Sequence, residues 1–178
     1  MAYTLIETVT VGSGGASGIE FTGIPQEAGA DLVIRLSARG STTGTQVRVT
    51  FNSDAGSNYV TTNLYGTGSG NASGTYSGAR INWGYGSVST DTANTFSNGQ
   101  LTISNYSGST TKSVSADIVS ENNATAASQN IAVGLWNDTS AITSIQLSHT
   151  GDFVEHSTAS LYLVTTADAT GATVPAPS

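Results

Sequence analysis

The sequence predicts an all-β fold, an antiparallel two-sheet β-sandwich with a jelly-roll-like arrangement. First, β-branched and aromatic residues alternate with polar ones along most of the chain, with the period of two that is typical of strands. Second, Gly, Ser and Asn interrupt this alternation about every 8–12 residues, the spacing expected of a sandwich or barrel. Third, helix-favouring Lys, Glu, Gln, Leu and Met are scarce, and no window shows a convincing helical period.

Five predicted strands occupy the first part of the chain. The clearest is Gln46–Phe51, in which Val47, Val49 and Phe51 share one face. The others are short runs of the same kind, bounded by Gly, Ser, Asn or Pro. In chain order the five are residues 5–11, 19–24, 31–38, 46–51 and 58–64.

Six more predicted strands follow. Each is a run rich in Ile, Val, Leu or aromatic residues between polar, turn-forming segments. In chain order they are residues 79–83, 100–103, 114–119, 131–136, 142–147 and 160–164. Two packed sheets built from these eleven strands would bury one face of each sheet.

The segments between the strands predict the domain organisation. Residues 12–18 are expected to form a short glycine hinge, and the Gly/Ser/Asn-rich residues 66–78 a long exposed loop. Residues 122–127 could form a short helix and are as well explained as a loop. We expect one sandwich domain over residues 1–164 and an extended C-terminal arm over residues 165–178, whose prolines favour an extended chain.

Composition excludes several classes of protein. The 178 residues include no cysteine, so no disulfide and no cysteine zinc site can form. The net charge of −7 and the scattered positions of the five basic residues argue against nucleic acid as a partner. No signal peptide and no apolar run long enough to cross a membrane are present, so we expect a soluble protein made in a cytoplasm.

No residue pattern predicts catalysis or a bound cofactor. His149 and His156, with the acidic residues between them, match no zinc spacing and are expected to be exposed in a turn. Asn52, Asp54 and Asn58 are spaced like oxygen ligands of calcium, but the usual glutamate is missing and a hairpin turn explains them equally. Neither a nucleophile elbow nor a pair of carboxylates stands out, and we expect no enzyme activity.

The aromatic residues could serve the core or a carbohydrate site. Rings of this kind fill sandwich cores and also stack on sugars. Trp83 and Tyr85, which follow the 66–78 segment, form the best candidate for an exposed pair that contacts glycans. The full set is Tyr59, Tyr65, Tyr76, Trp83, Tyr85, Tyr106, Trp136 and Tyr162.

An ordered set of short segments resembles a known family. The segments are residues 18–25, 31–34, 49–59, 93–96, 103–106, 120–126 and 134–145. Together they resemble small β-sandwich virion proteins of tailed, mostly aquatic, bacteriophages. The resemblance spans about residues 5–164, and the ordered set rather than any one motif carries it.

The resemblance implies a jelly-roll-like module on the capsid exterior. Such proteins decorate or cement the head, commonly as homotrimers, and their partner would be the phage major capsid protein. Because the first predicted strand follows Met1 closely, we expect no N-terminal anchor or fibre shaft. The first strand and the arm, represented by Tyr3, Leu5, Val174 and Pro175, would contact the shell or a neighbouring subunit.

The resemblance also leaves an alternative open. Related modules look like head fibres or tail-associated adhesins, so the chain could be a carbohydrate-binding adhesion module that contacts host-surface glycans through Trp83 and Tyr85. It implies no catalytic residues in either case, and we expect no cofactor, no nucleic-acid partner and no membrane.

Overall fold

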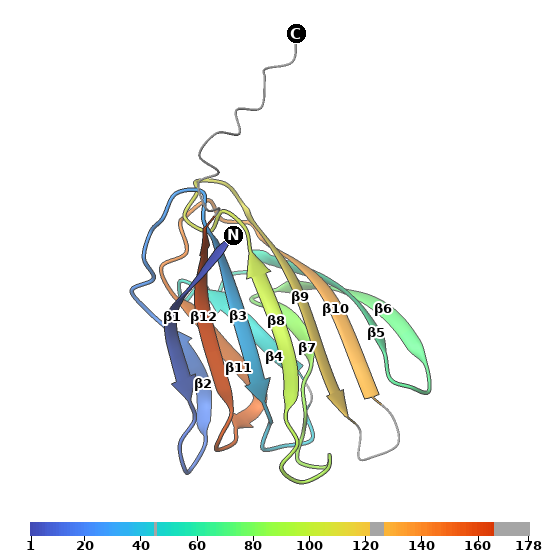
Figure 1. Ribbon diagram of the computed structural model, residues 1–178. Helices are drawn as coiled ribbons and strands as arrows, with labels where there is room; N and C mark the ends of the chain where they lie inside the picture. The colour runs from blue at the N-terminus through green and yellow to red at the C-terminus, as the bar shows by residue number, and fades with distance from the viewer. Residues whose placement is uncertain (45, 122–126, 166–178) are drawn as a thin grey trace.

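The computed structural model describes residues 1–44, 46–121 and 127–165 (Figure 1). Over these ranges the chain is all-β, as the sequence predicts, and contains no helix that could cross a membrane. The predicted arm at 165–178 lies outside the described residues except for Thr165, and the segment at 122–127 except for Ala127. The strands are β1 (Ala2–Thr10), β2 (Ala16–Phe21), β3 (Asp31–Ala38), β4 (Gln46–Phe51), β5 (Tyr59–Gly66), β6 (Asn71–Gly78), β7 (Ile81–Tyr85), β8 (Ser97–Ile103), β9 (Lys112–Glu121), β10 (Ala127–Trp136), β11 (Ile145–Phe153) and β12 (Thr158–Thr165).

The strands form two antiparallel sheets with jelly-roll connectivity. The larger sheet has the order β1-β12-β3-β8-β9-β10-β5-β6, and the smaller one β2-β11-β4-β7. Early strands pair with late ones in nested fashion: β1 with β12, β2 with β11, β3 with β8 and β4 with β7. The β1–β12 and β3–β8 pairs lie in the larger sheet, and the β2–β11 and β4–β7 pairs lie in the smaller one. Successive strand pairs therefore alternate between the two sheets and enclose one core, which is the jelly-roll arrangement.

Two insertions lengthen the larger sheet beyond that nest. One is the β5–β6 hairpin between β4 and β7, and the other is the β9–β10 pair between β8 and β11. They join each other through the β10–β5 ladder, so all four strands extend the same edge. The larger sheet therefore reaches past the smaller one, and Figure 1 shows β5 and β6 at this far edge.

The core lies between the sheets and is built from alternating side chains. Val47, Val49 and Phe51 are fully buried, so the predicted inward face of β4 is confirmed. Phe51, Tyr59 and Trp136 form an aromatic cluster with ring centroids 5.5–6.3 Å apart. Burial of such large rings supplies much of the stabilising free energy of a sandwich.

The prediction of a long loop at residues 66–78 is wrong for most of that segment. Residues Asn71–Gly78 form β6, which pairs with β5 from Gly66↔Asn71 to Tyr59↔Gly78. None of its side chains is buried, so no hydrophobic alternation marks it in the sequence. Backbone hydrogen bonds define this edge strand, and they leave no trace in side-chain composition.

Most strand boundaries differ from the prediction by a few residues, and two of these differences have an identifiable cause. The expected hinge at 12–18 is shorter, because Ala16 already pairs with Phe153 as part of β2. The strand expected at 142–147 begins at Ile145 and continues to Phe153. Ile142 is buried but donates its backbone N–H to the Tyr106 carbonyl outside any ladder, so its apolar side chain suggested a strand that the backbone does not form.

Candidate functional site

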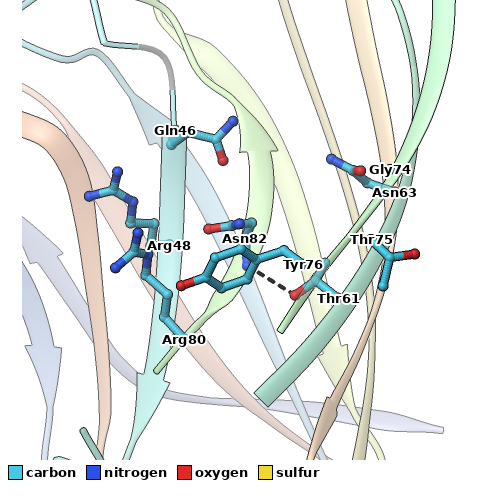
Figure 2. A pocket seen from close by; sticks show the side chains of 9 residues that line it. All are labelled: Gln46, Arg48, Thr61, Asn63, Gly74, Thr75, Tyr76, Arg80 and Asn82. Carbon is cyan, nitrogen blue, oxygen red and sulfur yellow. Dashed lines mark hydrogen bonds between the residues drawn. The ribbon is translucent and has the colours of Figure 1, made fainter. Parts of the chain in front are cut away.

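A cleft lined by two arginines lies where the β5–β6 hairpin meets the smaller sheet. Its volume is about 180 Å³. Because Val47 and Val49 point into the core, the alternation of β4 places Gln46 and Arg48 on the opposite face. Figure 2 shows them with the rest of the lining, which is Thr61, Asn63, Gly74, Thr75, Tyr76, Arg80 and Asn82.

One hydrogen bond fixes the floor of the cleft. The backbone N–H of Asn82 on β7 donates to the Thr61 hydroxyl on β5 across 3.1 Å (Figure 2). It joins the edge of the smaller sheet to the inner face of the hairpin. On the same hairpin, the Tyr76 ring lies 5.5 Å from the guanidinium carbon of Arg80, within the range of a cation–π contact. Most of the lining side chains thus come from paired strands, and Arg80 comes from the short turn between β6 and β7.

The cleft contains polar atoms without partners. Arg48 Nε, Arg80 Nε, Gln46 Oε1 and Asn82 Oδ1 are buried and accept or donate no hydrogen bond. Buried polar groups in folded proteins are nearly always paired, since each unpaired one costs about 1–3 kcal/mol. Four such atoms around one small space mark it as a place where a ligand would complete the hydrogen bonding.

The electrostatics of the cleft are those of two adjacent cations without a counterion. Burial and the Arg80 charge both lower the pKa of Arg48, and the Tyr76 hydroxyl opposes them. Among the described residues, no ion pair or hydrogen bond joins either guanidinium to the rest of the protein. Guanidinium groups are strong, delocalised cations, so two of them side by side favour a bound anion. Two of the five basic side chains of an acidic protein therefore face each other unpaired.

Arg39 has a structural role and serves as a comparison for Arg48 and Arg80. Its guanidinium is almost fully buried and donates to four backbone carbonyls in the 89–95 segment, over 2.8–3.3 Å. These bonds tie that segment to the end of β3. Arg48 and Arg80 make no comparable set of bonds, so a structural role does not account for them.

A second surface is an exposed apolar strip on the outer face of the larger sheet. We call it the aliphatic band: Val60 and Leu64 on β5, Val119 on β9, and Ile131, Val133 and Leu135 on β10. Leu64 lies opposite Ile131, and Val60 opposite Leu135, in the β10–β5 ladder. Val133 and Leu64 are 57% and 58% exposed. Contiguous exposed aliphatic residues of this kind commonly mark contact surfaces.

The aromatic pair expected to contact glycans is not an exposed pair. Trp83 is fully buried, and its indole N–H donates to the Asp117 carbonyl over 2.9 Å. The prediction of an exposed Trp83 is therefore wrong, because β7 turns this side chain into the core. Tyr85 is half-buried and packs edge-on against Tyr65, with ring centroids 5.0 Å apart.

Of the residues expected to contact the shell or a neighbour, two are described. Tyr3 and Leu5 lie on β1 and are each 53% exposed. The Tyr3 ring packs edge-on against Tyr162 of β12, with centroids 6.3 Å apart. Val174 and Pro175 lie outside the described residues.

The two histidines occupy different environments. His149 is buried within β11, so its predicted exposure in a turn is wrong; burial lowers its pKa. Its ring faces Gly40, where a missing side chain leaves room for it. His156 is exposed, with a left-handed backbone. No group of three or more His, Cys, Asp or Glu side chains suited to a metal occurs within residues 1–44, 46–121 and 127–165.

The calcium-like segment is organised as a turn around Asp54. Its carboxylate accepts hydrogen bonds from the Gly56 backbone N–H, the Asn58 side-chain amide and the Trp136 indole N–H, over 2.7–3.0 Å. The bond from Trp136 is the main cause of a lowered Asp54 pKa, followed by that from Asn58. The Asn58 side chain faces Asp54 with its amide N–H group as a donor, not with its oxygen.

We expect Asp54→Ala to lower the free energy of unfolding by about 1–2 kcal/mol, because the indole N–H of Trp136 loses its acceptor. The carboxylate is only partly buried, so water screens it in part and keeps the effect modest. Asp54→Asn, which keeps one acceptor oxygen, should fall between the wild type and the alanine variant. Urea unfolding followed by tryptophan fluorescence measures all three; equal stabilities would contradict this role for Asp54.

The same carboxylate gives a pH dependence of defined sign. The folded-state pKa of Asp54 is lower than its unfolded value of 3.8, so the stabilisation is fully present above that value. It is lost as the pH falls from about 3.8 through the folded-state pKa. The difference in stability between wild type and Asp54→Ala should therefore shrink over this acid range, and a constant difference would contradict the assignment.

The arginine cleft was not predicted from the sequence. Arg48 and Arg80 look scattered along the chain, and only the pairing of β4 with β7 brings them together. The one available signal was Arg48 at an outward position of a cleanly alternating strand. No protein-family model, curated protein or solved structure matches this chain. Function is therefore argued from the surfaces themselves.

Proposed function

We propose that the chain is a non-enzymatic structural protein of the head exterior of a tailed bacteriophage. In this role it decorates the capsid, self-associates as a homotrimer and stabilises contacts between major capsid subunits. The aliphatic band is the observation that carries the proposal. A jelly roll that exposes such a band on the broad face of its larger sheet has a surface suited to packing against another protein.

Three further features support an assembly role. The jelly roll is common among viral capsid proteins, although it also occurs in lectins and cupins. β1 and β6 are the two edge strands of the larger sheet, and edge strands can pair with a neighbouring chain. Tyr3 and Leu5 on β1 add exposed apolar contacts at one of these edges, which in this proposal face the capsid shell rather than another copy in the trimer.

The location is tested by cryo-electron microscopy of the purified virion. The proposal expects trimeric jelly-roll density on the outside of the capsid, with the aliphatic band covered by a neighbouring subunit. Density confined to the tail tip or fibres would contradict the head location and would favour an adhesion module.

The band is tested on the isolated protein. We expect Ile131→Thr/Val133→Thr to convert the homotrimer into a monomer of 18.0 kDa, because it replaces two exposed aliphatic side chains by polar ones of similar shape. Size-exclusion chromatography with light scattering measures the mass. Threonine suits a strand, so the variant should fold.

Leu5→Thr is the matched control, since it makes the same kind of change on β1, away from the band. We expect it to leave the trimer intact. Dissociation by Leu5→Thr, with the double variant still trimeric, would place the contact at the β1 edge and reject the band. A wild-type protein that is monomeric at every concentration tested would reject self-association itself.

A further inference from the structure

The cleft between β4, β7 and the β5–β6 hairpin contains donors and acceptors that both lack partners. The guanidinium groups of Arg48 and Arg80 need an anion. The buried oxygens Gln46 Oε1 and Asn82 Oδ1 need hydrogen-bond donors. An inorganic anion such as sulfate offers acceptors only, and a neutral sugar offers no charge, so neither complements the whole cleft.

A sugar that carries a carboxylate has both kinds of group. Its carboxylate accepts charge-assisted hydrogen bonds from guanidinium groups, and its hydroxyls donate to amide oxygens. The Tyr76 ring, beside Arg80, adds an aromatic surface of the kind on which sugars pack. A cleft of about 180 Å³ suits a single sugar unit rather than a long polymer segment.

We propose that this cleft binds an acidic sugar, with the carboxylate on Arg48 and Arg80 and the hydroxyls on Gln46 and Asn82. The inference is independent of the head location and of the aliphatic band. The sugar would supply hydrogen bonds that the two arginines do not make within the protein. The arginines therefore contribute to binding and not to the stability of the fold. The net negative charge of the protein disfavours anion binding over most of its surface.

The test is a titration of the ¹⁵N-labelled full chain with glucuronate, followed by amide chemical shifts. Glucose is the matched neutral ligand, since it differs by a hydroxymethyl group in place of the carboxylate. Sodium sulfate is the anion without hydroxyl donors. We expect glucuronate to shift amides of β4, β6 and β7 that line the cleft, and to bind more tightly than either control.

Arg48→Gln and Arg80→Gln should each weaken glucuronate binding about tenfold, because each removes a charge-assisted hydrogen bond. Arg35→Gln is the matched control, since it removes the same charge from an exposed position on β3, outside the cleft. It should leave binding unchanged. Gln46→Ala, which keeps both charges, should weaken glucuronate but not sulfate.

Stability separates this role from a structural one. The melting temperatures of Arg48→Gln and Arg80→Gln should equal or exceed that of the wild type, since the change removes repulsion between two cations. If glucose bound as tightly as glucuronate, the role of the carboxylate would be overturned. If sulfate bound as tightly as glucuronate, the role of the hydroxyls would be overturned. Equal weakening by Arg35→Gln, or no shifts with glucuronate, would overturn the site.

Discussion

Replacing Trp83 with alanine is expected to lower the free energy of unfolding by about 3–5 kcal/mol, the cost of removing a fully buried aromatic side chain. Trp83 lies on β7 and is fully buried, and its indole N–H donates to the Asp117 carbonyl on β9. It therefore joins the smaller sheet to the larger one. Alanine would leave a cavity between the sheets and would remove this hydrogen bond.

Trp83→Phe separates these two contributions, because it retains most of the buried ring and removes the hydrogen bond. We expect it to cost less than the alanine variant. Tyr85→Phe is the control on the same strand: it removes only a hydroxyl from a half-buried ring and should change stability by less than about 1 kcal/mol. Guanidinium unfolding followed by circular dichroism measures all three. Trp83→Ala as stable as wild type would contradict the buried position and restore an exposed, ligand-contacting tryptophan.

Gly40→Ala is expected to cost about 3 kcal/mol, because the added methyl group meets the buried ring of His149. A Cβ at position 40 would lie 2.2 Å from His149 Cε1 and 2.3 Å from Nδ1. The ring has little room to retreat, since it packs edge-on against Phe153 with centroids 5.8 Å apart. Thermal unfolding measures the loss.

A double-mutant cycle isolates this contact. In a His149→Ala background the ring is gone, so adding Gly40→Ala should cost little more. Gly12→Ala is the matched control, since a Cβ there would meet nothing within 4 Å, and it should be neutral. An equal cost of Gly40→Ala in both backgrounds would show that the backbone, and not the His149 ring, requires glycine at this position.

The strands that the sequence predicted well are those whose side chains alternate because one face is buried. Asp31–Ala38 and Gln46–Phe51 have the predicted bounds, and the core face of β4 was read directly from its valines. This signal is strong because burial on one face of a sheet constrains every second residue. It predicted the fold class and most of the elements.

Features that depend on distant partners could not be read in this way. β6 is held by backbone pairing with β5, so its polar side chains resembled a loop. Burial of His149 depends on Gly40, whose importance becomes visible only when the two segments are adjacent. Arg48 and Arg80 form a site because β4 pairs with β7, and no local pattern in the chain encodes that pairing.

The nested pairing of early with late strands also has a kinetic consequence. In the larger sheet β12 lies between β1 and β3, so β1 has no partner until the end of the described chain has been synthesised. Sandwich topologies with such large sequence separations fold slowly, in about milliseconds to seconds. During translation the early strands therefore remain as open edges, and their exposure to aggregation is governed by the time the ribosome takes to deliver β12.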